Sequence, residues 1–405
     1  MRQPTIVTVV LCIAAVRLDA AAPATGPEGT LAPEDFAILP WSGTQPDPGI
    51  LREIRECGFN LAGFVRPEGL DAVAAAGLKC IVSSDHTHVG DEQAKLDDAE
   101  IARRVRELVD RVARHPAVFG YYLRDEPNAT IYPGLARWAA AYRKADPRAV
   151  PYINLFPNYA SPAQLGVRTY EEYLESFIRI VKPPFVSYDH YALMDDGSLR
   201  EGYFQNLETI RAAALRHKLP FWNIVLSNAH FRYAEPTEAG LRFQVYTTLA
   251  YGGRGISWFT YFSPAVGNYR LAPIDPFGNK TPTWDMLRRV NLQIHKLAPV
   301  YCKLTSVNVF HVPDVPAECR GATSSRFLDE ISGGSFVVGE FEAPDARRYV
   351  MVVNKSLRES AAFHIRFKWP GQIMQVNAYT GVVCPWAGEN NWLAPGQGML
   401  LCLQE

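Results

Sequence analysis

Short apolar runs alternate with amphipathic helical patterns through residues 33–300. In the segment Ala102–Val112, for example, apolar residues recur at i, i+3 and i+4, so one helix face is expected to pack on a sheet. Strands that alternate with helices predict right-handed βαβ crossovers and hence a parallel sheet. The expected strands are Phe36–Trp41, Phe59–Val65, Lys79–Ser83, Val118–Leu123, Pro151–Phe156, Phe185–Tyr191, Phe221–Ser227 and Gly255–Phe262.

Helical patterns separate or follow these runs, and several have proline near the start and glycine near the end. Eight such strand–helix units match the usual size of a (β/α)₈ barrel, about 250 residues. A doubly wound sheet would instead need a glycine-rich phosphate turn after the first strand, and Trp41-Ser42-Gly43-Thr44 does not supply one. The predicted helices are Asp47–Cys57, Pro67–Ala76, Asp97–Arg114, Gly134–Ala145, Thr169–Val181, Ser198–His217, Pro236–Tyr251 and Thr283–Leu297.

After Val300 the chain carries short alternating or apolar strands, separated by turn signals such as Gly333-Gly334 and Pro395-Gly396. This pattern predicts a small antiparallel β-sandwich over residues 301–405, following a barrel over residues 33–300. Stabilisation of the barrel is the preferred role for this domain, and carbohydrate binding is the alternative. The expected strands are Ser306–Val312, Ser335–Phe341, Arg348–Asn354, Ala362–Phe367, Gln375–Tyr379 and Met399–Leu403.

The N-terminus has a basic start, a short apolar run from Ile6 to Val16, and small residues at Ala20-Ala21-Ala22. This arrangement is typical of a secretory signal peptide, here residues 1–22, and residues 23–32 are interpreted as a tether. We therefore expect a secreted or periplasmic protein, and no membrane span, because the apolar run is too short to cross a bilayer. Six cysteines remain after the signal. Their even number permits disulfides in an exported chain, and buried thiols are the alternative.

Composition and charge narrow the classes of partner. The chain is 48% hydrophobic and 20% charged, with a formal net charge of −1 and no basic stripe, which argues against nucleic acid or an anionic membrane. The cysteines have no C-x-x-C spacing and no histidine cluster joins them, so we expect no zinc site. Neutral polymers or small neutral ligands are the favoured partners.

The stretch Val118–Asn128 runs from an apolar, aromatic strand directly into two carboxylates and a proline, Asp125-Glu126-Pro127. In parallel α/β folds the catalytic groups gather at the carboxyl ends of the strands. Strand alternation places Arg124 and Glu126 on one face and Asp125 on the other, but a bulge at the strand end would bring both carboxylates to the same side. The alternative is a solvent-exposed ion cluster of Arg124 with its two acidic neighbours.

Other strand ends carry carboxylates, amides and aromatic residues, but no lysine and no phosphate loop. Planar polar groups bind sugar hydroxyls, and aromatic faces stack on the C–H surface of a pyranose, so this set is typical of a carbohydrate site. No cofactor is expected. The predicted substrate contacts are Asp125, Asn154, His190, Tyr191, Asn228, Trp258 and His86.

Cleavage of a glycosidic bond requires a carboxylic acid that protonates the leaving oxygen and a second carboxylate that acts as nucleophile or base. Glu126 is the predicted acid, because its apolar strand and the nearby Asp125 and Asp189 should raise its pKa. Asp189, in the sixth strand, is the predicted second catalytic carboxylate.

The Asp-Glu-Pro sequence that ends the fourth strand resembles the acid/base signature of clan A glycoside hydrolases. The segment Gln244–Phe262 also resembles the helix-seven and strand-eight region of β-galactosidase-like, family 42-type barrels. The resemblance extends over residues 33–300 and to the C-terminal β-domains of these enzymes. It implies a retaining double displacement, with Glu126 as acid/base and a glutamate nucleophile that ends strand seven.

The end of strand seven departs from that family pattern, because Phe221–His230 contains no carboxylate. Three alternatives follow. Asp189 serves as nucleophile or base; the Asp125–Glu126 pair assists attack by the acetamido group of a 2-acetamido sugar; or the barrel binds glycans without catalysis. The predicted function is that of an exported glycoside hydrolase acting on an oligo- or polysaccharide.

Overall fold

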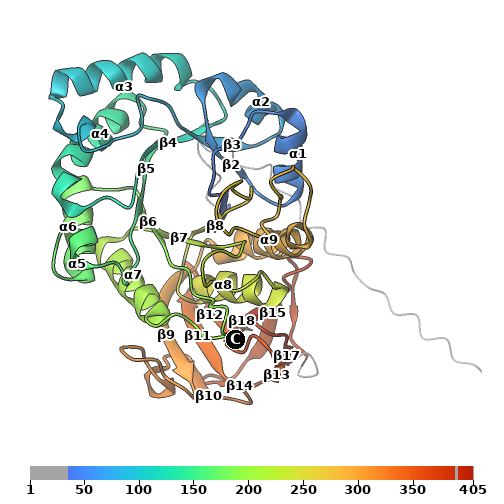
Figure 1. Ribbon diagram of the computed structural model, residues 1–405. Helices are drawn as coiled ribbons and strands as arrows, with labels where there is room; N and C mark the ends of the chain where they lie inside the picture. Colours follow the sequence, from blue (N-terminus) through green and yellow to red (C-terminus); the bar gives the residue numbers. More distant parts are fainter. Residues whose placement is uncertain (1–34, 388–390, 405) are drawn as a thin grey trace, which may run out of the picture.

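The computed structural model describes residues 35–387 and 391–404 of the chain (Figure 1). The expected signal peptide and tether, residues 1–22 and 23–32, lie outside these residues. The described part forms a barrel of parallel strands surrounded by helices, and antiparallel sheets follow it.

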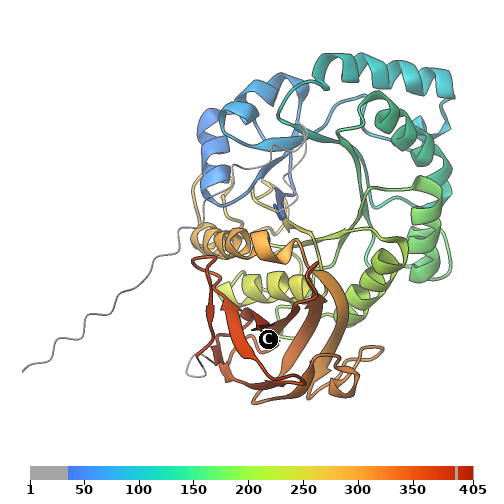
Figure 2. The ribbon, with the colours of Figure 1, turned by 180° about the vertical axis from the view of Figure 1, so that it is seen from behind.

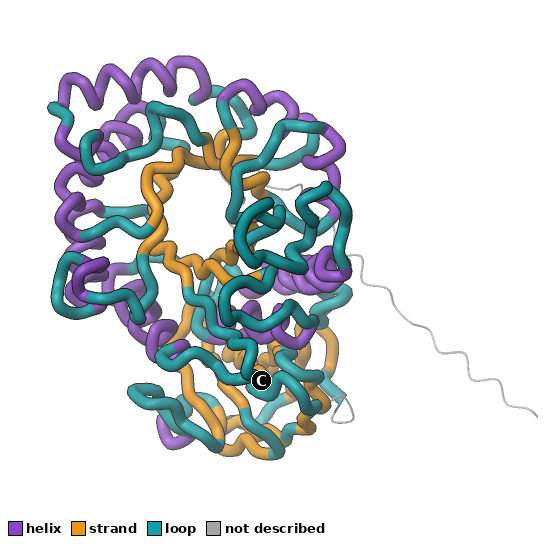
Figure 3. Tube along the Cα trace, viewed as in Figure 1, coloured by secondary structure: helices purple, strands orange, loops and turns teal. Residues whose placement is uncertain are grey.

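The strands of the barrel sheet have the order β1-β8-β7-β6-β5-β4-β3-β2, and Figure 3 shows them as a ring. The backbone N–H of Thr44 donates to the carbonyl of Phe64 at 2.9 Å, and the N–H of Phe64 donates to that of Ser42 at 3.0 Å. These bonds join the two edges just beyond β1. The strands are β1 (Ala37–Pro40), β2 (Leu61–Val65), β3 (Lys79–Val82), β4 (Val118–Asp125), β5 (Val150–Leu155), β6 (Val186–Asp189), β7 (Phe221–Leu226) and β8 (Gly255–Phe259).

Helices form the layer outside the strand ring (Figure 1, Figure 2). Helix α3 shows why: its buried residues Ile101, Val105 and Leu108 recur at helical spacing, so one stripe packs inward. Within the described residues, no helix is long and apolar enough to cross a bilayer. The helices are α1 (Pro48–Glu56), α2 (Leu70–Ala75), α3 (Asp98–Val112), α4 (Tyr132–Ala145), α5 (Pro162–Leu165), α6 (Tyr170–Val181), α7 (Tyr203–His217), α8 (Glu238–Ala250) and α9 (Pro282–Tyr301).

Aromatic side chains fill the inside of the barrel. Trp41, Phe64, Tyr122 and Tyr152 pack together, with ring centroids 4.5 Å apart for Phe64 and Tyr122 and 5.6 Å apart for Trp41 and Tyr152. Trp222, near the amino end of β7, lies 6.0 Å from Tyr152. Because protein interiors are close-packed, these rings form a rigid base for the residues at the strand ends.

The C-terminal domain packs a large antiparallel sheet, of order β16-β15-β18-β12-β11-β9, against α8. Gly339 in β11 permits this approach, since a Cβ at that position would collide with the carbonyl oxygen of Ala250 in α8. The other face of the sheet forms a separate core with the β10–β14 and β13–β17 pairs. The strands are β9 (Thr305–Val312), β10 (Leu328–Ser332), β11 (Phe336–Glu342), β12 (Arg348–Asn354), β13 (Ala361–Ala362), β14 (His364–Phe367), β15 (Gln372–Val376), β16 (Val383–Pro385), β17 (Trp392–Leu393) and β18 (Gly398–Gln404).

This architecture confirms the predicted (β/α)₈ barrel followed by a small antiparallel β-sandwich. The sequence patterns missed α5, β10, β16 and β17, because segments this short show little periodicity. The expected strand Ala362–Phe367 is split between β13 and β14, and the expected strand Gln375–Tyr379 lies earlier, at Gln372–Val376.

None of the described cysteines forms a disulfide. Cys57 and Cys80, the first two of the described cysteines, are both buried. Burial raises the pKa of the Cys80 thiol to about 12, so this side chain behaves as a small apolar group.

Glu340 in β11 is a fully buried carboxylate in the C-terminal domain. It accepts hydrogen bonds from Asn308 Nδ2 at 2.9 Å and from Ser325 Oγ at 2.7 Å. The backbone N–H groups of Arg326 and Phe327 also donate to it, each at 2.8 Å. The Glu340 side chain therefore provides the acceptor for several hydrogen-bond donors in the segment between β9 and β10.

We expect Glu340→Ala to lower the free energy of unfolding by about 2–4 kcal/mol, because it leaves several buried donors without an acceptor. Urea denaturation measures the change. The control is Glu342→Ala, an exposed position at the end of the same strand, for which a change within about 0.5 kcal/mol is expected. Equal effects of the two substitutions would contradict this role for Glu340.

Candidate functional site

The carboxyl end of β4 presents Asp125 and Glu126. The register of β4 against β5 shifts between Tyr122 and Arg124, which is the kind of irregularity needed for both carboxylates to reach one side. Glu126 has a φ of 43°, in the left-handed region that residues with a Cβ rarely adopt and that is common at functional sites. Its N–H donates to the carbonyl of Asn154 at 2.9 Å, so β5 holds this turn in place.

One amide, the side chain of Asn154 in β5, connects two of the carboxyl groups. Its Nδ2 donates to Asp125 Oδ1 and to Asp189 Oδ1, both at 3.0 Å. Its Oδ1 accepts from Ser187 Oγ at 2.9 Å, and Ser187 Oγ lies 2.9 Å from the hydroxyl of Tyr152. Asn154, Ser187 and Tyr152 are buried, so this chain of hydrogen bonds fixes the amide with its N–H groups toward the carboxylates.

Glu126 and Asp189 are joined by a hydrogen bond between their carboxyl groups. Burial, and then the charge of Asp125, raise the pKa of Glu126 to about 7. Burial, and then the charges of Glu126 and Asp125, raise the pKa of Asp189 well above its ordinary value. Since ionisation of both members of the pair is strongly unfavourable, the pair keeps a proton near neutral pH.

Arg124 is directed to the loop after β3 and does not form the ion cluster that was the alternative for this segment. Its Nη1 donates to the carbonyl of Val89 at 3.3 Å, and its Nη2 lies 3.4 Å from Asp91 Oδ1. Burial raises the pKa of Asp125, whereas the Asn154 hydrogen bond and the Arg124 charge act in the opposite direction. Asp125 is therefore the carboxyl of this group that ionises most readily.

Tyrosine side chains lie beside the carboxyl groups. Tyr191, which follows β6, stacks on Phe259 at the end of β8, with ring centroids 5.5 Å apart. Burial and then the charges of Asp189 and Asp125 raise the pKa of Tyr191 well above its ordinary value, because the phenol lies close to them. Tyr159 is 38% exposed, and the Asp189 charge adds to burial in raising its pKa.

His190 packs against Tyr159, one of these tyrosine side chains. It is fully buried, its Nδ1 lies 2.9 Å from Asn206 Oδ1, and its ring meets that of Tyr159 edge-on at 5.0 Å. Burial lowers the pKa of His190 to about 4, so the ring is neutral at physiological pH. The Arg200 guanidinium lies 4.3 Å from the centroid of Tyr159 and donates to the hydroxyl of Tyr233 at 2.9 Å.

Trp258 and Asn228, both predicted substrate contacts, lie in the interior of the protein. Trp258 has no exposed surface, and its Nε1 donates to Asn291 Oδ1 in α9 at 3.0 Å, so it faces the helix layer. Asn228 is also fully buried: its Nδ2 donates to the carbonyl of Phe259 at 2.8 Å, and its Oδ1 lies 3.0 Å from His230 Nδ1. Asn228 thus ties the loop after β7 to β8.

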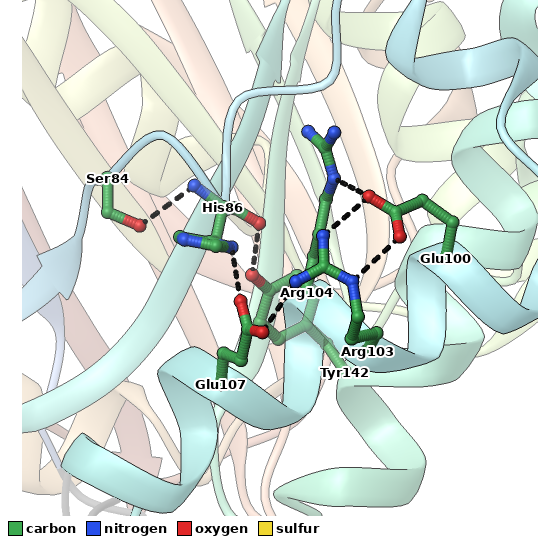
Figure 4. Close-up of polar contacts among 7 residues, drawn as sticks. All are labelled: Ser84, His86, Glu100, Arg103, Arg104, Glu107 and Tyr142. Carbon is green, nitrogen blue, oxygen red and sulfur yellow. Dashed lines mark hydrogen bonds and ion pairs between the residues drawn. The ribbon is translucent and has the colours of Figure 1, made fainter.

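His86, another predicted substrate contact, lies against the helix layer (Figure 4). Its Nδ1 is 3.9 Å from Glu107 Oε2 in α3, and its carbonyl accepts from the hydroxyl of Tyr142 in α4 at 2.6 Å. Its N–H donates to Ser84 Oγ at 3.2 Å. These contacts make His86 an anchor of the loop after β3, and the structure does not bring it to Glu126.

The sequence analysis missed Ser187, Tyr152, Tyr159 and Arg200, which orient the site. Ser187 is two residues before Asp189 on the same strand, so alternation places both on one face and could have identified it. Tyr159 and Arg200 lie in loops whose positions depend on tertiary packing, and no periodic signal marks them. In the described part of the chain, no group of three or more His, Cys, Asp and Glu side chains is arranged to hold a metal ion.

Glu126→Gln is expected to stabilise the fold in mildly alkaline solution. The folded protein holds the proton of Glu126 up to a pKa of about 7, whereas the unfolded chain loses it near 4.5. The contribution of this group to the free energy of unfolding therefore falls as the pH rises from about 4.5 to about 7, and glutamine, which cannot ionise, avoids that loss.

Melting temperatures measured at about pH 5 and about pH 8 check this expectation. The advantage of Glu126→Gln over the wild type should be larger at the higher pH, and the exposed control Glu201→Gln should show no such difference. A Glu126→Gln protein that is less stable than the wild type at both pH values would contradict it.

No family model matches the sequence, and no curated protein matches it. The structure of the chain, in contrast, is similar to several solved structures. A catalytic mutant of a GH42 β-galactosidase from G. stearothermophilus matches with a TM-score of 0.60 at 7% identity, over 92% of this chain and 98% of that one. A glycoside hydrolase of family 5 from Bacteroides vulgatus matches with a TM-score of 0.59 at 12% identity, over 92% and 90%. For a β-galactosidase from the psychrophilic Marinomonas ef1, the TM-score is 0.50 at 10% identity, and the match spans 68% of this chain and 63% of that one.

These identities are low, so the likeness concerns the fold. The matches over 92% of the chain extend beyond the barrel and include the C-terminal domain. The chain therefore shares the fold of these structures, a (β/α)₈ barrel followed by a C-terminal β-domain, as the sequence resemblance implied.

Proposed function

We propose that this chain is a glycoside hydrolase that cleaves O-glycosidic bonds of an oligo- or polysaccharide, with Glu126 as the general acid. The observation that carries the proposal is the position of Glu126 at the carboxyl end of β4 beside Asp125 and Asp189, where burial and the charge of Asp125 raise its pKa to about 7. A carboxylic acid that remains protonated near neutral pH is suited to protonate a leaving-group oxygen. The glycoside hydrolases that share this fold support the same class of substrate.

Asp189 assists Glu126 in this scheme through the hydrogen bond between their carboxyl groups. The hydrogen bond from the protonated Asp189 lowers the pKa of Glu126 and so opposes part of the effect of burial. The same bond stabilises the carboxylate that remains on Glu126 after its proton has moved to the leaving group. Glu126 thus keeps its proton up to about pH 7, and Asp189 stabilises the Glu126 carboxylate once that proton has been transferred.

Direct attack by Asp189 on an anomeric carbon is not favoured by its position. The exposed fraction of Asp189 is 4%. Its Oδ1 accepts a hydrogen bond from Asn154, and its carboxyl group is also hydrogen-bonded to Glu126. Retaining enzymes separate their carboxyl groups by about 5–5.5 Å and inverting enzymes by about 6.5–9.5 Å, whereas two hydrogen-bonded carboxyl groups are closer than either. We therefore assign Asp189 a proton-holding role beside the acid.

Asp125 favours a second candidate reaction, in which the acetamido group of a 2-acetamido sugar attacks its own anomeric carbon. Asp125 is partly exposed and adjacent to Glu126, and Asn154 Nδ2 holds its Oδ1 at 3.0 Å. An ionised carboxylate in that position would orient the acetamido N–H. Tyr191 and Tyr159 would supply the aromatic surface for the sugar ring in either reaction.

Export is a further part of the proposal and depends only on the N-terminal pattern over residues 1–22. A secreted or periplasmic enzyme would meet polysaccharides outside the cytoplasm. A barrel that binds glycans without catalysis is the remaining alternative, and the turnover experiment below separates it from an enzyme.

Hydrolysis of aryl glycosides should require the protonated form of Glu126. We expect kcat/KM to fall about tenfold per pH unit above the pKa of about 7. Glu126→Gln should reduce turnover by about 10²–10⁴-fold, while Glu201→Gln leaves it unchanged. The loss should be larger for phenyl glycosides than for 4-nitrophenyl glycosides, because the poorer leaving group depends more on protonation. Unchanged turnover in Glu126→Gln would show that Glu126 is not the acid.

The two candidate reactions differ in their response to Asp125→Asn. If the acetamido group attacks, turnover should be confined to 4-nitrophenyl 2-acetamido-2-deoxyglycosides, and Asp125→Asn should lower their kcat by about tenfold or more. Turnover of glycosides with a plain 2-hydroxyl group would exclude a reaction that requires the acetamido group. A panel of chromogenic glycosides with and without that group makes the measurement.

A further inference from the structure

The C-terminal domain contains a pocket of about 520 Å³ formed by β15 and β18 of its large sheet together with α8 and β17. Helix α8 contributes one lining residue, and the others come from β15 and its following turn, from β17, from the segment that enters β18, and from the start of β18. In Figure 1, β15 and β17 lie on the far side of α8 from β4, so this pocket is separate from Glu126. The lining residues used below are Arg242, Gln375, Asn377, Tyr379, Trp392 and Gln397.

Two exposed aromatic side chains line this pocket. Tyr379 is 71% exposed and Trp392 is 64% exposed. Strand alternation explains the position of Trp392, because its neighbour Leu393 is fully buried in the domain core and the tryptophan takes the opposite face. The turn that carries Tyr379 is fixed by Asn377 Oδ1, which accepts from the N–H groups of Tyr379 and Thr380 at 2.9 and 3.1 Å. Large apolar surfaces held in solvent in this way mark binding sites.

The other polar side chains of the lining are mainly uncharged, and they alternate with apolar residues. Side-chain amides come from Gln375, Asn377 and Gln397, and none of the lining residues is acidic. The guanidinium of Arg242 is largely covered: Glu238 Oε1, from a carboxylate that also pairs with Arg289, lies 3.2 Å from its Nη1, and its Nε donates to the carbonyl of Pro395 at 3.1 Å. The chemistry of the pocket therefore fits an uncharged ligand that offers hydroxyl groups.

We propose that this pocket is a second carbohydrate site, which binds a neutral oligosaccharide or a segment of a neutral polysaccharide. Tyr379 and Trp392 stack on the C–H faces of pyranose rings, and the amides of Gln375 and Gln397 bind hydroxyl groups between them. The site holds a chain substrate near the barrel without taking part in bond cleavage. It does not depend on the proposed role of Glu126, because stacking requires no turnover.

Affinity electrophoresis in native gels tests this proposal. The probes are four soluble neutral polysaccharides: galactan, xylan, galactomannan and mixed-linkage β-glucan. The full chain carrying Glu126→Gln is used so that the polysaccharide in the gel is not degraded. We expect at least one of the four to slow its migration, and adding Trp392→Ala and Tyr379→Ala to weaken that interaction by about tenfold or more.

The matched control is Trp369→Ala, a second partly exposed tryptophan of the same domain that lies outside the pocket and is covered by the Arg348 guanidinium at 3.9 Å. It should migrate like its parent. In the chain with native Glu126, the double variant should hydrolyse a small aryl glycoside at the parental rate, so loss of polysaccharide binding is read independently of catalysis. Melting temperatures confirm that the variants fold.

Three results would overturn the proposal. None of the four polysaccharides slows the parent protein; or the double variant is slowed as strongly as its parent; or sedimentation shows a dimer of the parent that the double substitution converts to a monomer. The last result would make the pocket a contact between copies of the chain. Binding that is lost only in the double variant supports the carbohydrate site, even if Glu126→Gln has no effect on turnover.

Discussion

Three carboxyl groups and one buried amide share a small volume at the carboxyl ends of β4, β5 and β6, and this crowding is the constraint on which the site depends. Asn154 has two amide N–H donors, and it directs them to Asp125 and Asp189. Neither of these N–H groups is directed to the Glu126 carboxyl group, which is instead hydrogen-bonded to Asp189. Because burial and like charge both oppose ionisation, the site retains a proton where three isolated carboxyl groups would retain none.

The surrounding structure keeps this unfavourable arrangement in place. The register shift in β4 and the left-handed conformation of Glu126 turn both carboxylates to one side. The Tyr152–Ser187–Asn154 chain then fixes the amide between them. The aromatic packing inside the barrel supplies the rigid base that holds the carboxyl groups in their relative positions. The cost of the buried carboxyl groups is offset by the large apolar core around them.

Most of the fold could be predicted from the sequence, because each barrel strand is a local apolar run and each long helix has a clear period. The positions of Glu126 and Asp189 at the strand ends could be predicted for the same reason, because both residues follow such runs, and the structure brings the two side chains together. Asn228 and His86 lie in loops, whose conformation no strand pattern fixes, whereas the orientation of Trp258 has a different physical cause. Adjacent residues in a strand face opposite sides, so the end of a strand identifies a position along the barrel axis but not an orientation.

Trp258 and Phe259 illustrate that limit. Trp258 faces α9 and is fully buried, whereas Phe259 packs on Tyr191 near the carboxyl groups. Tyr159 and Arg200 could not be predicted, because their loops are positioned by contacts across the fold. The raised pKa of Glu126 was expected from its apolar strand, but the hydrogen bond to Asp189 depends on the exact bend at the end of β4.

The protonation state of Glu126 tests the central claim most directly. In protein labelled with ¹³C at the glutamate carboxyl carbon, NMR should show one resonance that titrates with a midpoint of about 7 and is missing from Glu126→Gln. In Asp125→Asn that midpoint should move to lower pH, because the charge of Asp125 is the second cause of the shift. If the Glu126 resonance titrates near its ordinary value of 4.5, the site does not hold its proton and the account is contradicted.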